Sequence, residues 1–272
     1  MQKYSVIGCP IGHTMSPFIH EKLFTLSGLF AQYSVKEISP ENLGHEMPSL
    51  CELDGFNITI PHKVAVMQYL NALDDSAALC GAVNTVKCEG GRTCGYNTDM
   101  FGFEKAASGL APGGTSIIAG CGGAARAIAV SCLKAGGEVI FAVREGSLEK
   151  GVALSINLAG VGGTITVCAD SAPPKECDLL INTTPVGMFP NVGEIPLSQE
   201  WVMGAKAVFD AVYNPGDTAL LKLAQSLGKP FAGGMEMLVW QAAKAHEIWY
   251  GAQFEEGDIK KITEDAKGRL CK

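Results

Sequence analysis

Hydrophobic and polar positions along the chain follow two periods, which predict an alternation of strands and helices. A period of two is typical of strands, whereas an apolar face recurring every three or four residues is typical of helices. In the first hundred residues we expect strands at 4–8, 32–38, 56–60, 82–88 and 92–97, and helices at 16–28, 41–50 and 63–70. Beyond residue 115 we expect strands at 116–120, 138–144, 164–169, 177–184 and 205–213, and helices at 124–136, 148–160, 217–228, 235–251 and 258–270.

Short-range signals predict where several elements begin and end. Ser16 is expected to cap the helix at 16–28, and Gly28 to end it. Glu-Gly-Gly, between the strands at 82–88 and 92–97, predicts a hairpin. A helix with a Pro- and Gly-rich loop at 99–114 is expected to link two parts of the chain.

The stretch FNITIPHK, residues 56–63, predicts a half-buried strand that ends at a proline and is followed by a lysine. Asn57 and Thr59 alternate with apolar residues and so share one side of the strand. Pro61 lacks the N–H that a ladder hydrogen bond needs, so the strand should stop there. Lys63 then follows at the strand's end, where it is either a surface lysine or part of a site.

The order of elements after residue 115 predicts a parallel sheet. Strands and helices alternate with short connections, which requires right-handed crossovers. The strands are apolar almost throughout, as expected of a sheet that is covered on both faces. The fold class is therefore α/β.

Composition narrows the classes of function. The chain has 272 residues, 47% of them hydrophobic, which suffices for a sizeable core or two domains. Its net charge is −7 and its basic residues are scattered, which argues against nucleic acid as a partner. The ten cysteines form no Cys-x-x-Cys pair, so no metal site is expected. Without a signal peptide or a membrane-length apolar run, we expect a cytoplasmic protein.

A glycine-rich turn after the strand at 116–120 predicts a dinucleotide site. Gly120-x-Gly122-x-x-Ala125 lies between a strand and a helix. Gly120 allows the tight turn, Gly122 lets backbone approach a pyrophosphate, and Ala125 lets helix and strand pack closely. The N–H groups of the helix N-terminus then face the anion.

The strand predicted at 138–144 ends beside two residues that favour different cofactors. Arg144 is placed to pair with a ribose 2′-phosphate, which favours NADP, and Glu145 is placed to accept from a free 2′-hydroxyl, which favours NAD. A carboxylate beside a phosphate is repulsive, so one of the two side chains must turn away.

Other polar groups lie at the ends of predicted strands. Thr14 and Ser16 bring two hydroxyls to a helix start, which suits an anion. Asn84 follows a small-residue turn in GAVNT, and Asp99 lies at another strand-to-helix junction, in GYNTD. His13 and His62 are expected to make loop hydrogen bonds rather than to act in catalysis.

Eight stretches, taken together, resemble the shikimate dehydrogenase family. They are GxPIxHTxSP, NITIPHK, GAVNT, GYNTD, GCGGAAR, NTTPVGM, VYNP..T.LL and MLVWQAA, in the family's order from residue 8 onwards. The resemblance implies two α/β domains flanking a cleft, the second a Rossmann-type doubly wound sheet inserted between the two parts of the first. Residues 1–100 would bind substrate, 101–234 would bind NADP, and the C-terminal helices at 235–272 would complete the substrate domain.

The resemblance also implies roles for single residues. Lys63 and Asp99 would form the catalytic pair. Substrate would be held by its carboxylate at Thr14, Ser16 and Tyr213, and by its hydroxyls at Thr59, Asn84 and Gln241. The cofactor would be held by Gly120, Cys121, Gly122, Gly123, Ala124, Arg144, Gly234 and Met237.

The implied activity is the reversible NADP-dependent reduction of 3-dehydroshikimate to shikimate, on the route to chorismate and the aromatic amino acids. Thr14 stands where the family more often has serine, and Glu145 stands where the NADP-selective form has threonine. A quinate/shikimate dehydrogenase that uses NAD is therefore an alternative, and a non-catalytic shikimate sensor is a more distant one. We expect a monomer or homodimer that binds a small-molecule substrate.

Overall fold

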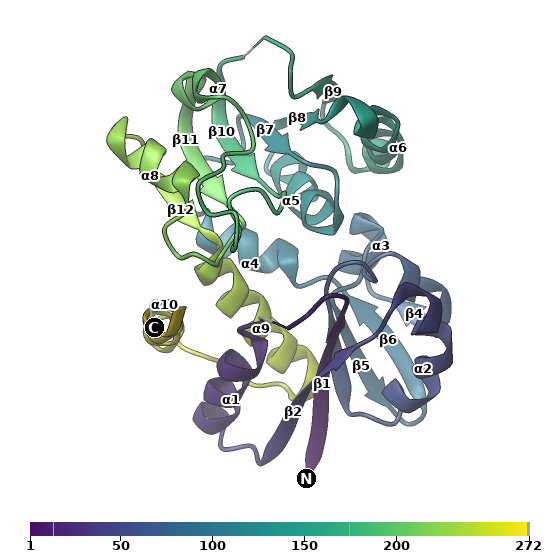
Figure 1. Cartoon of the computed structure of the whole chain (residues 1–272). Coiled ribbons are helices and arrows are strands. Elements are labelled where there is room, and N and C mark those ends of the chain that lie inside the picture. Colours follow the sequence, from purple (N-terminus) through teal and green to yellow (C-terminus); the bar gives the residue numbers. More distant parts are fainter. Residues whose placement is uncertain (13, 174, 271–272) are drawn as a thin grey trace. The chain divides into compact units, whose positions relative to one another are not determined.

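The chain forms two compact units, each built around its own sheet (Figure 1). The computed structural model describes residues 1–12, 14–173 and 175–270. The first unit contains Met1–Asp99 and Val239–Ala266, and the second contains Met100–Leu238 with the segment from Lys267.

The first unit has a six-stranded mixed sheet with the order β2-β1-β3-β5-β6-β4. Its strands are β1 (Gln2–Gly8), β2 (Ala31–Glu37), β3 (Gly55–Ile58), β4 (Ala72–Leu73), β5 (Thr85–Glu89) and β6 (Arg92–Tyr96). β1 pairs in parallel with β2 and β3, whereas β5 is antiparallel to both β3 and β6. The predicted hairpin is confirmed, with Gly90 and Gly91 at positive φ in its turn.

Helices lie on both faces of this sheet. They are α1 (Ser16–Ser27), η1 (Pro40–Asn42), α2 (Leu43–Leu50), η2 (Ala65–Tyr69), α3 (Asp75–Cys80), and most of α9 (Gly234–Tyr250) and of α10 (Glu256–Leu270). One apolar cluster joins Phe56 and Ile58 of β3 to α2 and η2. A second cluster joins Tyr4 of β1 to Phe24 of α1 and Trp249 of α9.

Three local predictions for this unit are wrong in detail. The strand predicted at 56–60 spans Gly55–Ile58 and is buried on both faces, because helices cover both sides of it. The N-cap of α1 is Met15, while Ser16 is the first helical residue; Gly28 does end the helix, at φ 68°. The segment 63–70 forms the short 3-10 helix η2 rather than an α-helix.

The second unit has a six-stranded parallel sheet with the order β12-β11-β10-β7-β8-β9. Its strands are β7 (Thr115–Ala119), β8 (Glu138–Val143), β9 (Ile165–Ala169), β10 (Cys177–Asn182), β11 (Ala205–Asp210) and β12 (Phe231–Gly233). Its helices are α4 (Asp99–Ala106), α5 (Gly123–Lys134), η3 (Glu145–Ser147), α6 (Leu148–Leu158), η4 (Ala159–Val161), α7 (Gln199–Gly204) and α8 (Ala219–Ser226).

The strand order is that of a Rossmann sheet, in which the chain starts at the centre, winds to one edge and then returns to wind to the other. The helices that follow β7 and β8 therefore cover one face, and those that follow β10 and β11 cover the opposite face (Figure 1). The prediction of an α/β fold with a doubly wound parallel sheet is confirmed. The sequence did not predict β12 or α7, which are only three and six residues long.

A buried carboxylate joins the ends of two strands in this unit. Asp210 closes β11 and is fully buried. It accepts hydrogen bonds from the Asn182 side chain at 2.9 Å, the Val212 N–H at 3.0 Å and the Thr218 hydroxyl at 2.6 Å. Burial raises the pKa of Asp210 to about 6, although these three donors oppose the shift. The network fixes the loops that follow β10 and β11.

We predict that Gly55→Ala destabilises the chain by about 2 kcal/mol, the usual cost of overpacking a core. A Cβ at Gly55 would lie 2.7 Å from Trp249 Cδ1 and 2.8 Å from the Val86 carbonyl oxygen. Urea unfolding measures the loss. Gly257→Ala is the control, because its added Cβ would meet no described atom within 4 Å apart from its chain neighbours and the adjacent backbone of its own helix. An equal free energy of unfolding for wild type and Gly55→Ala would contradict the packing described.

We also predict that Asp210 makes stability depend on pH. Its pKa is about 6 in the folded chain against the usual 3.8, so its contribution is present below 3.8 and is lost as pH rises through 6. The free energy of unfolding of wild type, relative to Asp210→Asn, should fall by about 2 kcal/mol between pH 4.5 and 7. A constant difference across that range would refute the assignment.

Candidate active site

The turn that carries Lys63 is fixed by buried hydrogen bonds at the end of β3. The His62 ring is 1% exposed, and its Nε2 lies 2.6 Å from the Ile38 carbonyl oxygen. The Lys63 carbonyl oxygen accepts from the Val83 N–H at 2.7 Å. His62 is therefore a loop hydrogen-bonding residue, as predicted, while His13 lies outside the described residues. The backbone around Lys63 is held at both ends of the turn.

Lys63 and Asp99 form an ion pair that is largely shielded from solvent. Lys63 Nζ donates to Asp99 Oδ2 at 2.5 Å, and the two side chains are 14% and 8% exposed. Asp99 is the first residue of α4, and its N–H donates to the Asn97 side chain at 3.1 Å. The Coulomb attraction in a pair this buried is less screened than at the surface but is offset by desolvation, and loss of one partner leaves an uncompensated charge.

Asn84 and Gln241 extend the pair into a polar cluster. Asn84 Nδ2 lies 2.8 Å from Asp99 Oδ1, 3.0 Å from Thr98 Oγ1 and 3.3 Å from Gln241 Oε1. Asn84 Oδ1 accepts from the Thr98 N–H at 2.7 Å, which fixes the amide's orientation. Four of the residues predicted from the sequence, Lys63, Asn84, Asp99 and Gln241, are thus in one hydrogen-bonded group.

Thr14 and Ser16 present two hydroxyls side by side at the start of α1. Thr14 Oγ1 donates to Ser16 Oγ at 3.0 Å and accepts from the Ser16 N–H at 3.2 Å. The Ser16 hydroxyl also hydrogen-bonds Tyr33, whose pKa is raised well above its usual range by burial. Tyr33 is consequently a neutral hydrogen-bond donor.

A buried chain of side chains connects these hydroxyls to the ion pair. Tyr33 donates to Asn57 Oδ1 at 2.7 Å, and Asn57 Nδ2 donates to Thr85 Oγ1 at 3.0 Å. The Thr85 hydroxyl lies 3.3 Å from Thr98 Oγ1, beside Asn84. Sequence reasoning missed Tyr33, Thr85 and Thr98 as members of the site. The sequence did indicate Asn57 as a polar position in the strand, because it alternates with apolar neighbours, but it did not indicate its hydrogen-bond partners.

Thr59 is not part of this network. Its hydroxyl has no hydrogen bond within the described part of the chain, and its methyl group lies against Gly8. The Thr59 N–H continues the β1 pairing by donating to the Ile7 carbonyl oxygen at 2.9 Å. A role for Thr59 with substrate stays a prediction.

In the second unit, the glycine-rich turn has the geometry of a phosphate cradle. Gly120 has φ 102°, and a Cβ there would lie 2.9 Å from Thr183 Oγ1. Gly122 caps α5, and no atom lies within 4 Å of the position of its Cβ, so backbone can approach a ligand. Ala125 is fully buried where α5 packs on the sheet. The turn, which includes Cys121, Gly123 and Ala124, therefore fits a dinucleotide pyrophosphate.

The remaining cofactor candidates lie at the same edge of the second sheet. Arg144 follows β8, and Gly234 follows β12 directly and starts α9. A Cβ at Gly234 would collide with the Ala211 carbonyl group and lie 3.0 Å from the Val212 carbonyl carbon, so only glycine fits. Met237 is 7% exposed, one turn into α9. Tyr213 follows β11 in this unit, and its placement beside Thr14 and Ser16 stays a prediction.

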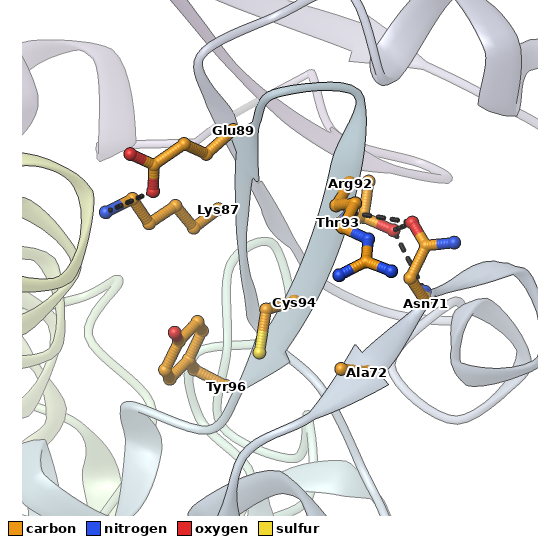
Figure 2. A pocket seen from close by; sticks show the side chains of 8 residues that line it. All are labelled: Asn71, Ala72, Lys87, Glu89, Arg92, Thr93, Cys94 and Tyr96. Atoms are coloured by element: carbon orange, nitrogen blue, oxygen red, sulfur yellow. Dashed lines mark hydrogen bonds and ion pairs between the residues drawn. The ribbon is translucent and has the colours of Figure 1, made fainter.

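A hollow of about 540 Å³ in the first unit is separate from this chemistry (Figure 2). Figure 2 shows Lys87 and Glu89 paired with each other, at 3.0 Å. Asn71 is likewise engaged, accepting from the Thr93 N–H at 2.8 Å. Four of the residues that line the hollow are thus bonded to one another in pairs.

Within the part of the chain that the structure describes, no group of three His, Cys, Asp or Glu side chains is arranged to hold a metal ion. Every described helix is too short or too polar to cross a lipid bilayer.

Comparison with known proteins identifies the family. Residues 6–86 match the family described as the shikimate dehydrogenase substrate binding domain. The shikimate dehydrogenase (NADP(+)) of Bacillus subtilis is 37% identical over 275 residues, covering 98% of this chain and 97% of that protein.

Two solved structures show the same fold over almost the whole chain. Shikimate 5-dehydrogenase of Thermus thermophilus, in complex with NADP(H) and shikimate, has a TM-score of 0.87, with 31% identity and coverage of 98% and 100%. The 5-ketofructose reductase of a Gluconobacter strain has a TM-score of 0.83, with 29% identity and coverage of 97% and 98%. By its identity to the Bacillus relative over nearly its full length, the chain belongs to the shikimate dehydrogenase family.

Proposed function

We propose that the chain catalyses the reversible NADP-dependent reduction of 3-dehydroshikimate to shikimate, a step towards chorismate and the aromatic amino acids. The observation that carries the proposal is the shielded Lys63–Asp99 pair, set among amide and hydroxyl groups in a chain whose relatives are named shikimate dehydrogenases. In this proposal residues 1–100 and 235–272 bind the substrate, and residues 101–234 bind NADP.

Lys63 is the proposed proton donor for the reduction. An ammonium has three N–H groups, and Asp99 uses one of them, so others remain for a substrate oxygen. Reduction builds negative charge on the ketone oxygen, which an adjacent ammonium neutralises by giving up a proton. In the reverse direction the neutral amine takes that proton from the hydroxyl of shikimate. NADPH, when bound, supplies the hydride.

Asp99 has a positioning part in this scheme. Its Oδ2 holds Lys63 and its Oδ1 accepts from Asn84, so both oxygens are fixed before substrate arrives. Prior fixation reduces the reorganisation that the reaction requires. Asn84 and Gln241 are proposed to meet the ring hydroxyls of substrate, with Thr59 contributing from the end of β3.

The hydroxyls of Thr14 and Ser16, together with Tyr213, are proposed to bind the substrate carboxylate. Two adjacent hydroxyls at a helix start are suited to an anion, because they donate hydrogen bonds beside the positive end of the helix. The fold alone leaves the substrate open, since a 5-ketofructose reductase shares it. The hydroxyl pair is the feature that favours an acid over a neutral sugar.

NADP is proposed to lie along the carboxyl edge of the second sheet. Gly120, Cys121, Gly122, Gly123 and Ala124 would hold its pyrophosphate, Arg144 its 2′-phosphate, and Gly234 with Met237 its nicotinamide end. The collision that a Cβ at Gly120 or Gly234 would cause supports this cradle.

We predict reduction of NADP+ when wild-type protein is mixed with shikimate, followed by absorbance at the reduced-nicotinamide band. The kcat/KM with NADP+ should exceed that with NAD+, because Arg144 pairs with the 2′-phosphate in this proposal. The kcat/KM for shikimate should likewise exceed that for quinate. A preference for NAD+ or quinate would favour a quinate/shikimate dehydrogenase. Calorimetric binding of shikimate without turnover would favour a sensor.

We predict that Lys63→Ala lowers kcat by ~10²–10⁴, the range for a positioned acid or base. The fold should survive with a lower urea midpoint, because Asp99 is left buried without its partner, and circular dichroism checks that the native structure is kept. Lys87→Ala is the matched control, because Lys87 is also a partly buried, ion-paired lysine of the first unit. Full turnover in Lys63→Ala would defeat the mechanism.

A further inference from the structure

The end of β8 carries two opposite charges, of which only one can serve the adenosine ribose. Arg144 and Glu145 are adjacent and exposed, at the strand end where the ribose lies in doubly wound sheets. A cation there favours a 2′-phosphate, whereas a carboxylate favours a free 2′-hydroxyl. The balance between them depends on where Glu145 points.

The structure shows Glu145 engaged with the neighbouring strand. Glu145 Oε1 accepts a hydrogen bond from Ser171 Oγ at 3.3 Å, and Ser171 follows the end of β9. The two strand ends are tied together, because the Asp170 N–H donates to the Val143 carbonyl oxygen at 2.8 Å. Arg144 makes no ion pair or side-chain hydrogen bond with any residue that the structure describes.

We propose that Ser171 determines cofactor specificity by holding the Glu145 carboxylate and thereby leaving Arg144 for the 2′-phosphate. The inference rests on the proposed use of NADP. Without the Ser171 hydroxyl, the carboxylate is free to neutralise Arg144 or to accept from a ribose 2′-hydroxyl. Both changes weaken the preference for NADP over NAD.

The proposed role of Ser171 can be tested by measuring the binding of two adenosine nucleotides, without enzyme turnover. Isothermal titration calorimetry gives the Kd of adenosine 2′,5′-bisphosphate and of adenosine 5′-monophosphate, and their ratio measures recognition of the 2′-phosphate. Ser171→Ala should reduce the preference for the bisphosphate about fivefold, the size of an effect between solvent-exposed charges. Glu145→Gln should raise the preference by a similar factor, because it removes the repulsive charge.

The double variant separates this specific role from a general disturbance. In the Glu145→Gln background, Ser171→Ala should leave the ratio unchanged, because no charge remains to be released. Asp170, the adjacent carboxylate, is present in every variant. Ser155→Ala is the matched control, since among the described residues the Ser155 hydroxyl bonds only to the Val152 carbonyl oxygen of its own helix.

The outcomes are distinguishable. Equal ratios for wild type and Ser171→Ala overturn the role of Ser171 and leave the proposed function standing. An equal effect of Ser171→Ala with and without the Glu145 charge also overturns it. Failure of wild type to prefer the bisphosphate overturns the proposed use of NADP, and the inference with it.

Discussion

The ion pair between Lys63 and Asp99 is the interaction on which the candidate active site depends. Charges that are 14% and 8% exposed are stable only when their positions are fixed, because misplacement leaves each charge desolvated without a partner. The surrounding backbone meets that need. The buried His62 ring holds the turn before Lys63, and the Asn97 side chain holds the N–H of Asp99. The site therefore belongs to the fold of the first unit and is not an addition to its surface.

The two units offer recognition of different kinds. In the first unit, side chains form the site, and each amide is oriented by a partner, as Asn84 is by Thr98. In the second unit, backbone would form the proposed cofactor cradle, and the sequence requirement is the absence of a side chain at Gly120 and Gly234. A substrate with several hydroxyls needs the first kind of site, and a pyrophosphate needs the second.

Features that depend on neighbours in the sequence were predictable. The hairpin at Gly90 and Gly91, the end of α1 at Gly28 and the strand-turn-helix around Gly120 all follow from local backbone preferences. Features that depend on distant partners were not. Tyr33 and Thr85 gain their place in the site through Asn57, 24 and 28 residues away along the chain. The full burial of β3 likewise follows from helices on both faces, which no pattern within 56–60 reveals.

Substrate and cofactor selectivity differ in how readily they can change. Asn57 and Asn84 are 5% and 2% exposed and hydrogen-bonded on both sides, so replacing either leaves a buried donor or acceptor without a partner. Glu145 and Ser171 are exposed, and solvent can satisfy either group if the other is removed. Under the proposed function we therefore expect a change of substrate to require several coordinated substitutions in the first unit. Under the proposed function we expect a change of cofactor to need fewer substitutions, at the rim of the second sheet, where exposed side chains can be replaced at little cost in stability.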